Sequence, residues 1–322
     1  MNFPWHQTTW EVLLRKTGEL PHALLLHGAR GIGKRALAER FAQYLLCEAR
    51  GAEAACDRCE ACRWYLAGHH PDLRRLEPEA LAVESGEERG SRARPSNEIK
   101  VEQVRALADF LNIGSHRGRL RVALVHPAEA LNVHAANALL KSLEEPPPGA
   151  VFVLVSHRPA RLLPTLRSRC VALAIPLPPN EKAHEWLAAQ GLADAGRWLA
   201  FAGGAPLRAL EDARGERGAV IAALLKALAA RDVQALSEQI DTRESLELLA
   251  ELLQKAALDR ALGAMGAEPK YGVLQRRGVR DAQGLRDWLA FARLMGRNQA
   301  LVRHPLNPKL FAAQMLAAMP KG

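Results

Sequence analysis

One stretch of the sequence decides the fold: Gly28-Ala29-Arg30-Gly31-Ile32-Gly33-Lys34-Arg35. It follows the apolar run 23–27, which has the composition of a buried strand, and it leads into the helical pattern of 35–46. A glycine-rich turn between a strand and a helix lets backbone N–H groups surround a phosphate while a lysine reaches the terminal phosphates. The context therefore favours a phosphate-binding loop over an ordinary turn. The candidate phosphate-binding residues are Gly28, Gly31, Gly33 and Lys34.

Two features depart from the pattern of an active ATPase. Arg35 follows the lysine where a magnesium-binding Ser or Thr is expected, and an arginine side chain cannot ligate a cation. The strand 122–125 should end in carboxylates that hold the metal and activate water, but His126 and Pro127 follow it. We interpret Glu129, further along, as a solvated residue at a helix start and not as a general base. Autonomous ATP hydrolysis is therefore not expected, and the sequence leaves open whether the loop binds a nucleotide at all.

Four of the five cysteines lie close together in a short polar segment. They are Cys47, Cys56, Cys59 and Cys62. Four thiolates suit a closed tetrahedral zinc site, which stabilises a segment too small to bury a core of its own. An iron–sulfur cluster, whose usual spacing differs, and ordinary buried cysteines are the alternatives. Because four protein ligands leave no position for water, the zinc is expected to be structural and not catalytic.

The composition is that of a globular protein. The chain has 322 residues, which suggests two or three domains, and 48% of them are hydrophobic. No apolar run approaches the roughly 20 residues of a membrane-spanning helix, and the N-terminus lacks the pattern of a signal peptide. The clustered cysteines fit a reducing compartment. We therefore expect a cytoplasmic protein without a membrane partner, whose net charge of +9 permits a nucleic-acid or an acidic protein partner.

The first half of the chain alternates apolar runs with helical patterns, which is typical of βαβ units around a parallel sheet. The expected strands are 23–27, 73–76, 121–125, 150–155 and 171–175, and the expected helices are 35–46, 101–111 and 135–143. The polar segment 77–98 is expected to be a mobile, solvated insertion. Prolines 176, 178 and 179 then mark a domain boundary, since proline continues neither a strand ladder nor a helix.

Beyond these prolines the pattern is almost wholly helical. The expected helices are 181–190, 195–202, 207–213, 220–229, 246–262, 285–294 and 308–319. The first three would form a small unit and the long Ala- and Leu-rich ones a separate bundle. We therefore expect three domains: a P-loop domain over 1–176 with the cysteine module at 47–62, a small helical domain over 177–214, and a helical domain over 215–322.

Two polar positions near the ends of strands have more than one interpretation. Ser156 follows the strand 150–155, where a polar residue could sense a phosphate or cap a helix. The arginines of Leu166-Arg167-Ser168-Arg169-Cys170 could form a solvated helix end or could present a guanidinium to phosphates held by a neighbouring subunit. From chemistry alone, the solvated helix end is the stronger interpretation.

Two motifs together resemble a known family. They are Ala136-Asn137-Ala138-Leu139-Leu140-Lys141-Ser142-Leu143-Glu144-Glu145-Pro146-Pro147 and Leu166-Arg167-Ser168-Arg169-Cys170. With the four-cysteine insertion after the first helix, they resemble the bacterial sliding-clamp loader ATPases of the AAA+ class. The resemblance implies an α/β fold: an AAA+ RecA-like parallel-sheet domain with a zinc-binding insertion, followed by a small helical lid and a C-terminal all-α collar.

Within this group, three positions separate the chain from the motor subunits, which are called gamma or tau. Two of them are Arg35 and the pair His126-Pro127. The third lies in the lid, where Leu207 takes the position of the motors' arginine and Arg208 comes one place later. The resemblance therefore points to the member of the group whose own nucleotide site is degenerate.

The resemblance also implies a function. The chain would be the stator of the DNA polymerase III clamp loader, a hetero-oligomeric ring that loads the sliding clamp onto primed DNA during replication. Arg169 would act in trans as an arginine finger on ATP bound by an adjacent motor subunit. The implied partners are the gamma or tau and delta subunits and, within the complex, the sliding clamp and primer–template DNA. The DNA-directed DNA polymerase activity would belong to the holoenzyme.

Two alternatives remain. The chain could be an active ATPase motor, since the glycines and Lys34 of the loop are intact. It could instead be a zinc-dependent nucleic-acid-binding module on an inert P-loop scaffold, which the basic charge and the four cysteines support.

Overall fold

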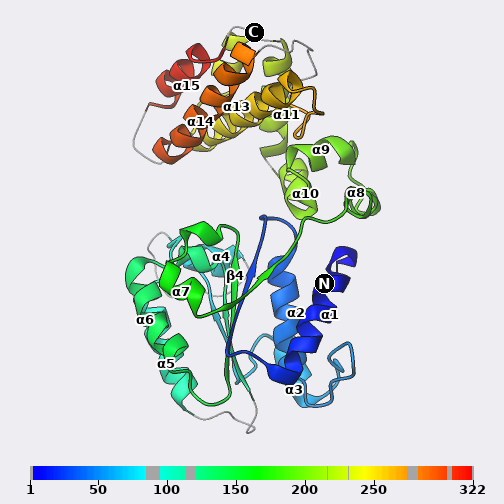
Figure 1. The fold of residues 1–322 in the computed structure, drawn as a ribbon, viewed down its shortest axis with the longest axis vertical. Helices are drawn as coiled ribbons and strands as arrows, with labels where there is room; N and C mark the ends of the chain where they lie inside the picture. The colour runs from blue at the N-terminus through cyan, green and yellow to red at the C-terminus, as the bar shows by residue number, and fades with distance from the viewer. Residues whose placement is uncertain are drawn as a thin grey trace. The chain divides into compact units, whose positions relative to one another are not determined.

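A computed structural model of the chain describes residues 3–84, 95–113, 120–215, 217–230, 232–273, 282–302 and 307–320. The chain divides into two compact units, residues 1–178 and 179–322 (Figure 1). The division into three domains, which separates a lid from a collar within the second unit, stays a prediction.

The first unit is built around a five-stranded parallel sheet. Its strands are β1 (Ala23–His27), β2 (Leu73–Leu76), β3 (Arg121–Val125), β4 (Ala150–Ser156) and β5 (Val171–Ala174), in the order β2-β3-β4-β1-β5. Every residue of β3 and β4 is buried, as expected of strands covered on both faces. The predicted α/β class is therefore confirmed. Because all five strands are parallel, their carboxyl ends meet at one edge of the sheet, and that edge is where ligands bind in such folds.

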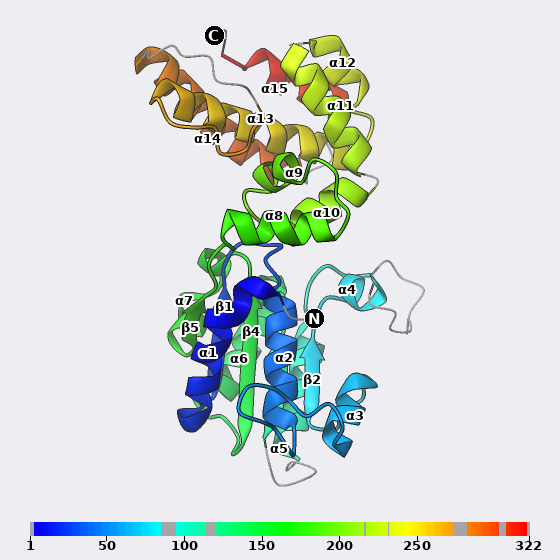
Figure 2. The ribbon, with the colours of Figure 1, turned by 90° about the vertical axis from the view of Figure 1, so that its right-hand side faces the viewer.

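Helices cover both faces of this sheet (Figures 1 and 2). One face carries α1 (Gln7–Lys16) and α2 (Lys34–Leu46), and the other carries α5 (Val101–Asn112), α6 (Val133–Glu144) and α7 (Pro164–Ser168). Leu107 of α5 and Leu139 of α6 are buried against Phe152 and Leu154 of β4 in one apolar core. The side chain of Asn132 accepts a hydrogen bond from the Ala135 N–H and thereby fixes the start of α6.

The segment 77–98 departs from the solvated insertion that the sequence predicts. Residues Glu79–Glu84 form the short helix α4, and Glu77 is buried. The Glu79 carboxylate lies 2.8 Å from Lys100 Nζ and accepts a hydrogen bond from the Ser96 N–H at 3.1 Å. The prediction was wrong for Glu77, which is buried, because composition does not show the partners that a distant part of the chain supplies. Residues 85–94, also in the predicted insertion, lie outside the described residues.

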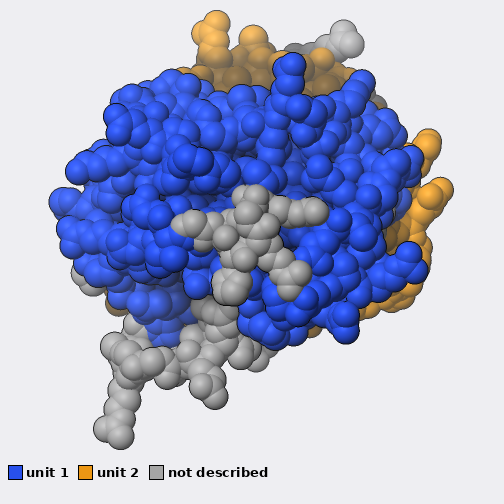
Figure 3. Space-filling view, turned by 90° about the horizontal axis from the view of Figure 1, so that it is seen from below, with its two compact units in different colours: residues 1–178 blue, residues 179–322 orange. Residues whose placement is uncertain are grey.

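Every described element of the second unit is a helix (orange in Figure 3). They are α8 (Asn180–Ala189), α9 (Ala195–Phe201), α10 (Pro206–Arg214), α11 (Arg217–Ala230), α12 (Val233–Glu238), α13 (Arg243–Ala264), α14 (Ala282–Leu301) and α15 (Pro308–Ala317). The core of this unit includes Leu224, Leu249, Leu253 and Met295, all fully buried. Among the described helices, none combines the length and the apolar character that crossing a membrane requires.

Candidate functional site

The glycine-rich turn joins β1 to α2 at the carboxyl edge of the sheet. Gly31 and Gly33 have φ angles of 81° and 87°, in the left-handed region that other residues rarely adopt. A Cβ atom at Gly28 would lie 2.4 Å from the carbonyl oxygen of Ile175, so glycine is also required there by the close approach of the backbone. The loop therefore has the tight conformation that a phosphate-binding turn needs.

Lys34 is the first residue of α2, and its ammonium group lies against its own loop. Nζ donates hydrogen bonds to the carbonyl oxygens of Gly28 at 2.9 Å and Ala29 at 2.5 Å. Burial lowers the pKa of Lys34 to about 8, and the charge of Glu129 opposes this shift. An ammonium group has three N–H donors, and carbonyl oxygens of the described residues accept two of them.

The residues before α1 close one side of this loop. The rings of Phe3 and Trp5 stack with centroids 5.0 Å apart, and both side chains are buried. Trp5 Nε1 donates a hydrogen bond to the carbonyl oxygen of Ile32 at 2.9 Å, and His6 Nε2 lies 2.8 Å from the same oxygen. A Cβ atom at Gly33 would lie 2.5 Å from the Phe3 ring. These aromatic contacts with the loop were not predicted from the sequence, although the aromatic residues Phe3 and Trp5 close together in the chain were a signal for them.

Arg35 forms an ion pair with a carboxylate of its own chain. Its Nη2 atom lies 3.0 Å from Oε2 of Glu77, which follows β2. One helical turn later, Glu39 accepts two hydrogen bonds from Arg75 of β2, at 2.9 and 3.0 Å. Arg35, which stands where a magnesium-binding Ser or Thr is expected, is thus paired with a carboxylate of its own chain. Its positive charge lies where an active ATPase would bind the magnesium ion.

The ends of β3 and β4 bring two histidines together. The rings of His126 and His157 are 5.4 Å apart and nearly perpendicular. Burial is the largest cause that lowers the pKa of each histidine to about 3. The second largest cause is the neighbouring His157 ring for His126 and the charge of Lys34 for His157. Both rings are therefore neutral near pH 7. No carboxylate directly follows β3, where a magnesium ligand is expected in an active ATPase.

Glu129 does not have the solvated position that the sequence predicts. It lies in a single 3-10 turn, Ala128–Ala130, and its Oε1 atom accepts a hydrogen bond from the His157 N–H at 2.9 Å. Its Oε2 atom is buried, and within the described residues it has no hydrogen-bond partner. The prediction was wrong because the chain turns back toward the sheet after Pro127 and brings Glu129 under the end of β4.

Ser156 is the last residue of β4 and is fully buried. Its Oγ atom accepts a hydrogen bond from the Arg158 N–H at 3.1 Å, and its carbonyl oxygen accepts one from the Gly28 N–H at 3.3 Å. Its hydroxyl therefore stabilises the turn after β4, and its backbone is tied to the phosphate loop. A role of Ser156 as a phosphate sensor stays a prediction.

Arg169 directly follows α7, and two acceptors of its own chain hold its guanidinium. Nη2 lies 2.5 Å from Oε1 of Glu144 at the end of α6, and Nη1 donates a hydrogen bond to the carbonyl oxygen of Thr165 at 2.8 Å. The Ser168 hydroxyl donates to the same carbonyl oxygen at 3.0 Å. The two motifs that are separate in the sequence therefore meet in the structure.

Arg208 of α10 binds carboxylates within the second unit. Its Nε atom lies 3.3 Å from Oδ2 of Asp212, and its Nη2 atom contacts Glu251 of α13. Glu251 also lies 2.6 Å from Nζ of Lys255, which donates a further hydrogen bond to the carbonyl oxygen of Phe201 at 2.7 Å. The guanidinium of Arg208, one residue after the expected lid position, is thus bound by carboxylates of its own unit.

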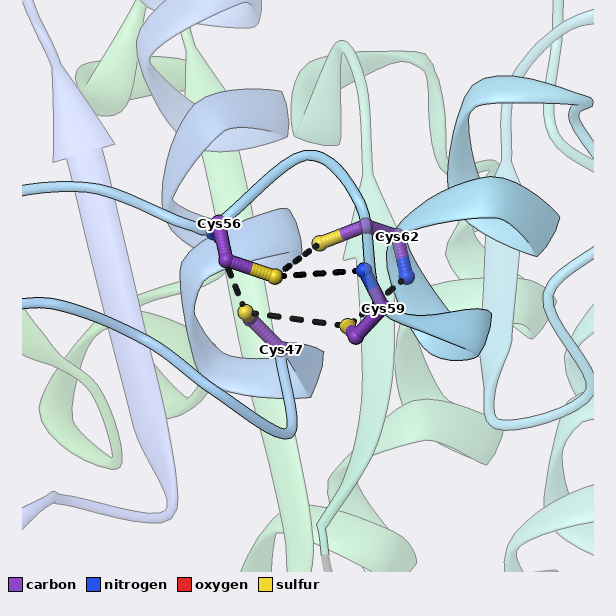
Figure 4. Close-up of side chains that lie close together, drawn as sticks. All are labelled: Cys47, Cys56, Cys59 and Cys62. Carbon is purple, nitrogen blue, oxygen red and sulfur yellow. Dashed lines mark hydrogen bonds between the residues drawn. The ribbon is translucent and has the colours of Figure 1, made fainter.

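The four clustered cysteines converge between the end of α2 and the helix α3 (Glu60–Leu66) (Figure 4). Their four Sγ atoms all lie within 4.8 Å of one another. The Sγ atoms of Cys47 and Cys59 are 3.9 Å apart, and those of Cys56 and Cys62 are 4.0 Å apart. Four sulfurs at about 2.3 Å from a zinc ion form a tetrahedron with edges of about 3.8 Å. The donor set therefore fits zinc.

Backbone N–H groups already point at these sulfurs. Cys56 donates to Sγ of Cys47 and Cys59 donates to Sγ of Cys56, both at 3.3 Å, while Cys62 donates to Sγ of Cys59 at 3.4 Å. N–H donors stabilise thiolates. The N–H of Arg58, and then that of Cys59, lowers the pKa of Cys56 to about 6, whereas burial raises the pKa of Cys62. A bound cation would hold all four sulfurs as thiolates, and four protein ligands make such a site structural.

Comparison with known proteins assigns the chain to a family. A family profile described as "DNA polymerase III, delta subunit" matches residues 6–179. The chain belongs to this family. The matched range contains the phosphate loop, the four cysteines and Arg169. "DNA polymerase III subunit delta'" of Pseudomonas aeruginosa is 45% identical over 214 residues, which are 64% of this chain and 60% of that protein. The protein of the same name from Yersinia pestis is 36% identical over 278 residues, 79% of this chain and 76% of that protein.

The names of these relatives agree with the resemblance that the sequence motifs indicate, which within the clamp-loader group is to the delta-prime subunit. The resemblance to this family is therefore confirmed. The chain matches about 60% of the length of the P. aeruginosa relative. Among solved structures, a gamma subunit-related protein of DNA polymerase III from Thermotoga maritima aligns with a TM-score of 0.49 at 17% identity, over 96% of this chain and 97% of that one.

Proposed function

We propose that this chain is the delta-prime subunit of the DNA polymerase III clamp loader and that it supplies Arg169 in trans to ATP held by an adjacent motor subunit. The names of its relatives support the assignment as a delta-prime subunit. One observation supports the role of Arg169 as an arginine finger: it directly follows α7, and its side chain is 33% exposed. Its hydrogen bonds to Thr165 and Glu144 leave part of the five-donor guanidinium for a phosphate.

The chain's own nucleotide loop supports the same assignment. ATP hydrolysis needs a magnesium ion on the β- and γ-phosphates and a group that positions water. Arg35 and His126 stand where the metal ligands are expected, and Arg35 is already paired with Glu77. The chain therefore contributes to hydrolysis at a neighbour's site and not at its own.

An arginine supplied in trans has a clear physical use. It stabilises the charge that develops on the transferred phosphoryl group, and it does so only when two subunits are correctly placed. Hydrolysis then depends on the geometry of the ring, and through the ring on the presence of the clamp and primed DNA. The helices of residues 215–322 would form the collar that joins this chain to the gamma or tau and delta subunits.

The test is ATPase activity of the complex reconstituted with gamma or tau and delta, with and without primed DNA and clamp. Arg169→Ala should remove most of the turnover at the adjacent motor site while leaving its ATP binding intact, since an arginine finger stabilises the transition state more than the ground state. Arg167→Ala, which changes an exposed arginine in the last turn of α7, is the matched control. Equal rates for wild type and Arg169→Ala would reject the proposal.

The Lys34 geometry favours a second candidate, an ATPase with its own nucleotide. The ammonium group of Lys34 lies against the glycine-rich loop, where an active phosphate-binding loop requires it. Hydrolysis of ATP by the isolated chain, lost in Lys34→Ala, would support this candidate over the stator.

A further inference from the structure

Glu144 is the nearest charged partner of Arg169 in the structure. It is the last residue of α6, and Arg169 is the first residue after α7, so the ion pair joins the ends of two helices on the same face of the sheet. The pair is short, with 2.5 Å between Oε1 and Nη2. Glu145, the next residue, is exposed as well and makes no described contact with Arg169.

This pairing places a negative charge on the group that would have to attract phosphates. The guanidinium donates to Glu144 through Nη2 and to Thr165 through Nη1, the two nitrogens with which an arginine grips a phosphate in two-point fashion. In this arrangement its charge is partly compensated, and one donor on each terminal nitrogen is already used. We propose that Glu144 is an intramolecular latch that competes with the neighbour's nucleotide for Arg169, an inference that rests on the proposed function of Arg169.

The exposure of the pair makes the exchange feasible. The side chains of Arg169 and Glu144 are 33% and 48% exposed, so water screens their attraction. Exposed ion pairs of this kind change an equilibrium by no more than about fivefold. A triphosphate carries more negative charge than one carboxylate and accepts two parallel hydrogen bonds, so it displaces Glu144 once a neighbour presents it. A buried pair would instead hold the arginine permanently.

The latch has a functional consequence. In the free subunit Glu144 competes with other anions for the guanidinium and lowers their apparent affinity by up to about fivefold. In the ring a nucleotide that is correctly placed overcomes this competition, because it can accept hydrogen bonds from both terminal nitrogens at once. Glu144 therefore sets the threshold at which this subunit activates its neighbour, without touching the nucleotide.

The test is a titration of the full-length chain into the other clamp-loader subunits at saturating ATP, with ATPase rate as the readout. Glu144→Gln removes the charge and keeps the shape. It should lower the concentration of this chain that gives half-maximal activation by up to about fivefold, with the maximal rate unchanged or higher. The shift should shrink as salt is raised, since salt screens the competing pair in the wild type. Glu145→Gln, the same charge change one residue away, should behave as wild type.

Two results separate the latch from the finger itself. If Arg169→Ala leaves the rate unchanged, the finger is wrong and the latch with it. If Arg169→Ala lowers the rate but Glu144→Gln has no effect or lowers the rate too, the finger stands and the latch is overturned. In the double variant the gain from Glu144→Gln must disappear, because the gain acts only through Arg169.

Discussion

Arg35 and Glu77 form an ion pair that joins the first turn of α2 to the residue after β2, with 3.0 Å between Nη2 and Oε2. Glu77 is buried, and Arg35 is about one-third exposed. The pair lies beside the phosphate loop, where an active ATPase has a neutral hydroxyl on a magnesium ion. The buried carboxylate of Glu77 is therefore compensated by a guanidinium of its own chain.

Replacing Arg35 alone should not create an ATPase. Arg35→Thr restores a hydroxyl for magnesium, but His126 still stands where a carboxylate should hold the metal. It also removes a cationic partner of the buried Glu77, at a cost of about 1 kcal/mol in the free energy of unfolding. Phosphate release with ATP and magnesium is the measurement. Turnover by Arg35→Thr that Lys34→Ala abolishes would show that the end of β3 does not limit the reaction.

Loss of one cluster cysteine should release zinc and destabilise the first unit. Cys59→Ala leaves three sulfurs, and it removes the sulfur that accepts the hydrogen bond from the Cys62 N–H and that contacts Sγ of Cys47. Metal analysis of the purified chain should fall from a single zinc ion to a substoichiometric value, with a lower melting temperature. Cys170→Ala is the control, since this cysteine lies outside the cluster. Full zinc content in Cys59→Ala would contradict the site.

Most of the fold could be predicted because burial and turn chemistry leave strong local patterns. The strands 73–76 and 121–125 were predicted with the bounds that the structure shows. Residues 122–125 form an apolar run, whereas 73–76 reads Leu-Arg-Arg-Leu, with a buried leucine at each end. The helices α1 and α3 were missed. Trp10 of α1 is buried against Phe41 and Tyr44 of α2, and Tyr65 of α3 donates a hydrogen bond to the carbonyl oxygen of Glu39. Such contacts with α2 stabilise short helices that local periodicity does not reveal.

The site was predictable where spacing along the chain fixes geometry and was not where distant residues meet. The cysteines and the glycine loop are local, and the structure brings each set together. The partners of Arg35, Glu129 and Arg169 come from elements far along the chain, and no pattern in the sequence identifies Glu77, His157 or Glu144 as those partners. The direction of a long charged side chain depends on those partners.

The buried charges of the second unit should be sensitive to the loss of one carboxylate. Glu251 contacts both Arg208 and Lys255, so Glu251→Gln leaves two cations near each other with only Asp212 to compensate them. We expect a loss of roughly 2 kcal/mol or more in the free energy of unfolding, measured by urea denaturation. Glu247→Gln, an exposed change one turn earlier on α13, should stay within about 0.5 kcal/mol of wild type. Equal midpoints for the two variants would show that the network adds nothing.

Stability should fall in mild acid because folding lowers the pKa values of several histidines, among them His126, His157 and His6. The pKa values of His126 and His157 are lowered from 6.5 to about 3, so between these values the unfolded chain binds protons that the folded protein does not. The free energy of unfolding therefore falls as the pH is lowered below about 6.5, by at most about 1.4 kcal/mol per pH unit for each histidine. Urea denaturation at about pH 7 and about pH 5.5 measures this slope. The double variant His126→Gln/His157→Gln should reduce the slope, of which His6, with a pKa lowered to about 4, keeps a part, whereas His134→Gln, exposed on α6, should leave it unchanged. Because all three proteins keep the cysteine cluster, acid release of its metal affects them alike, and an equal slope in all of them would contradict the assignment.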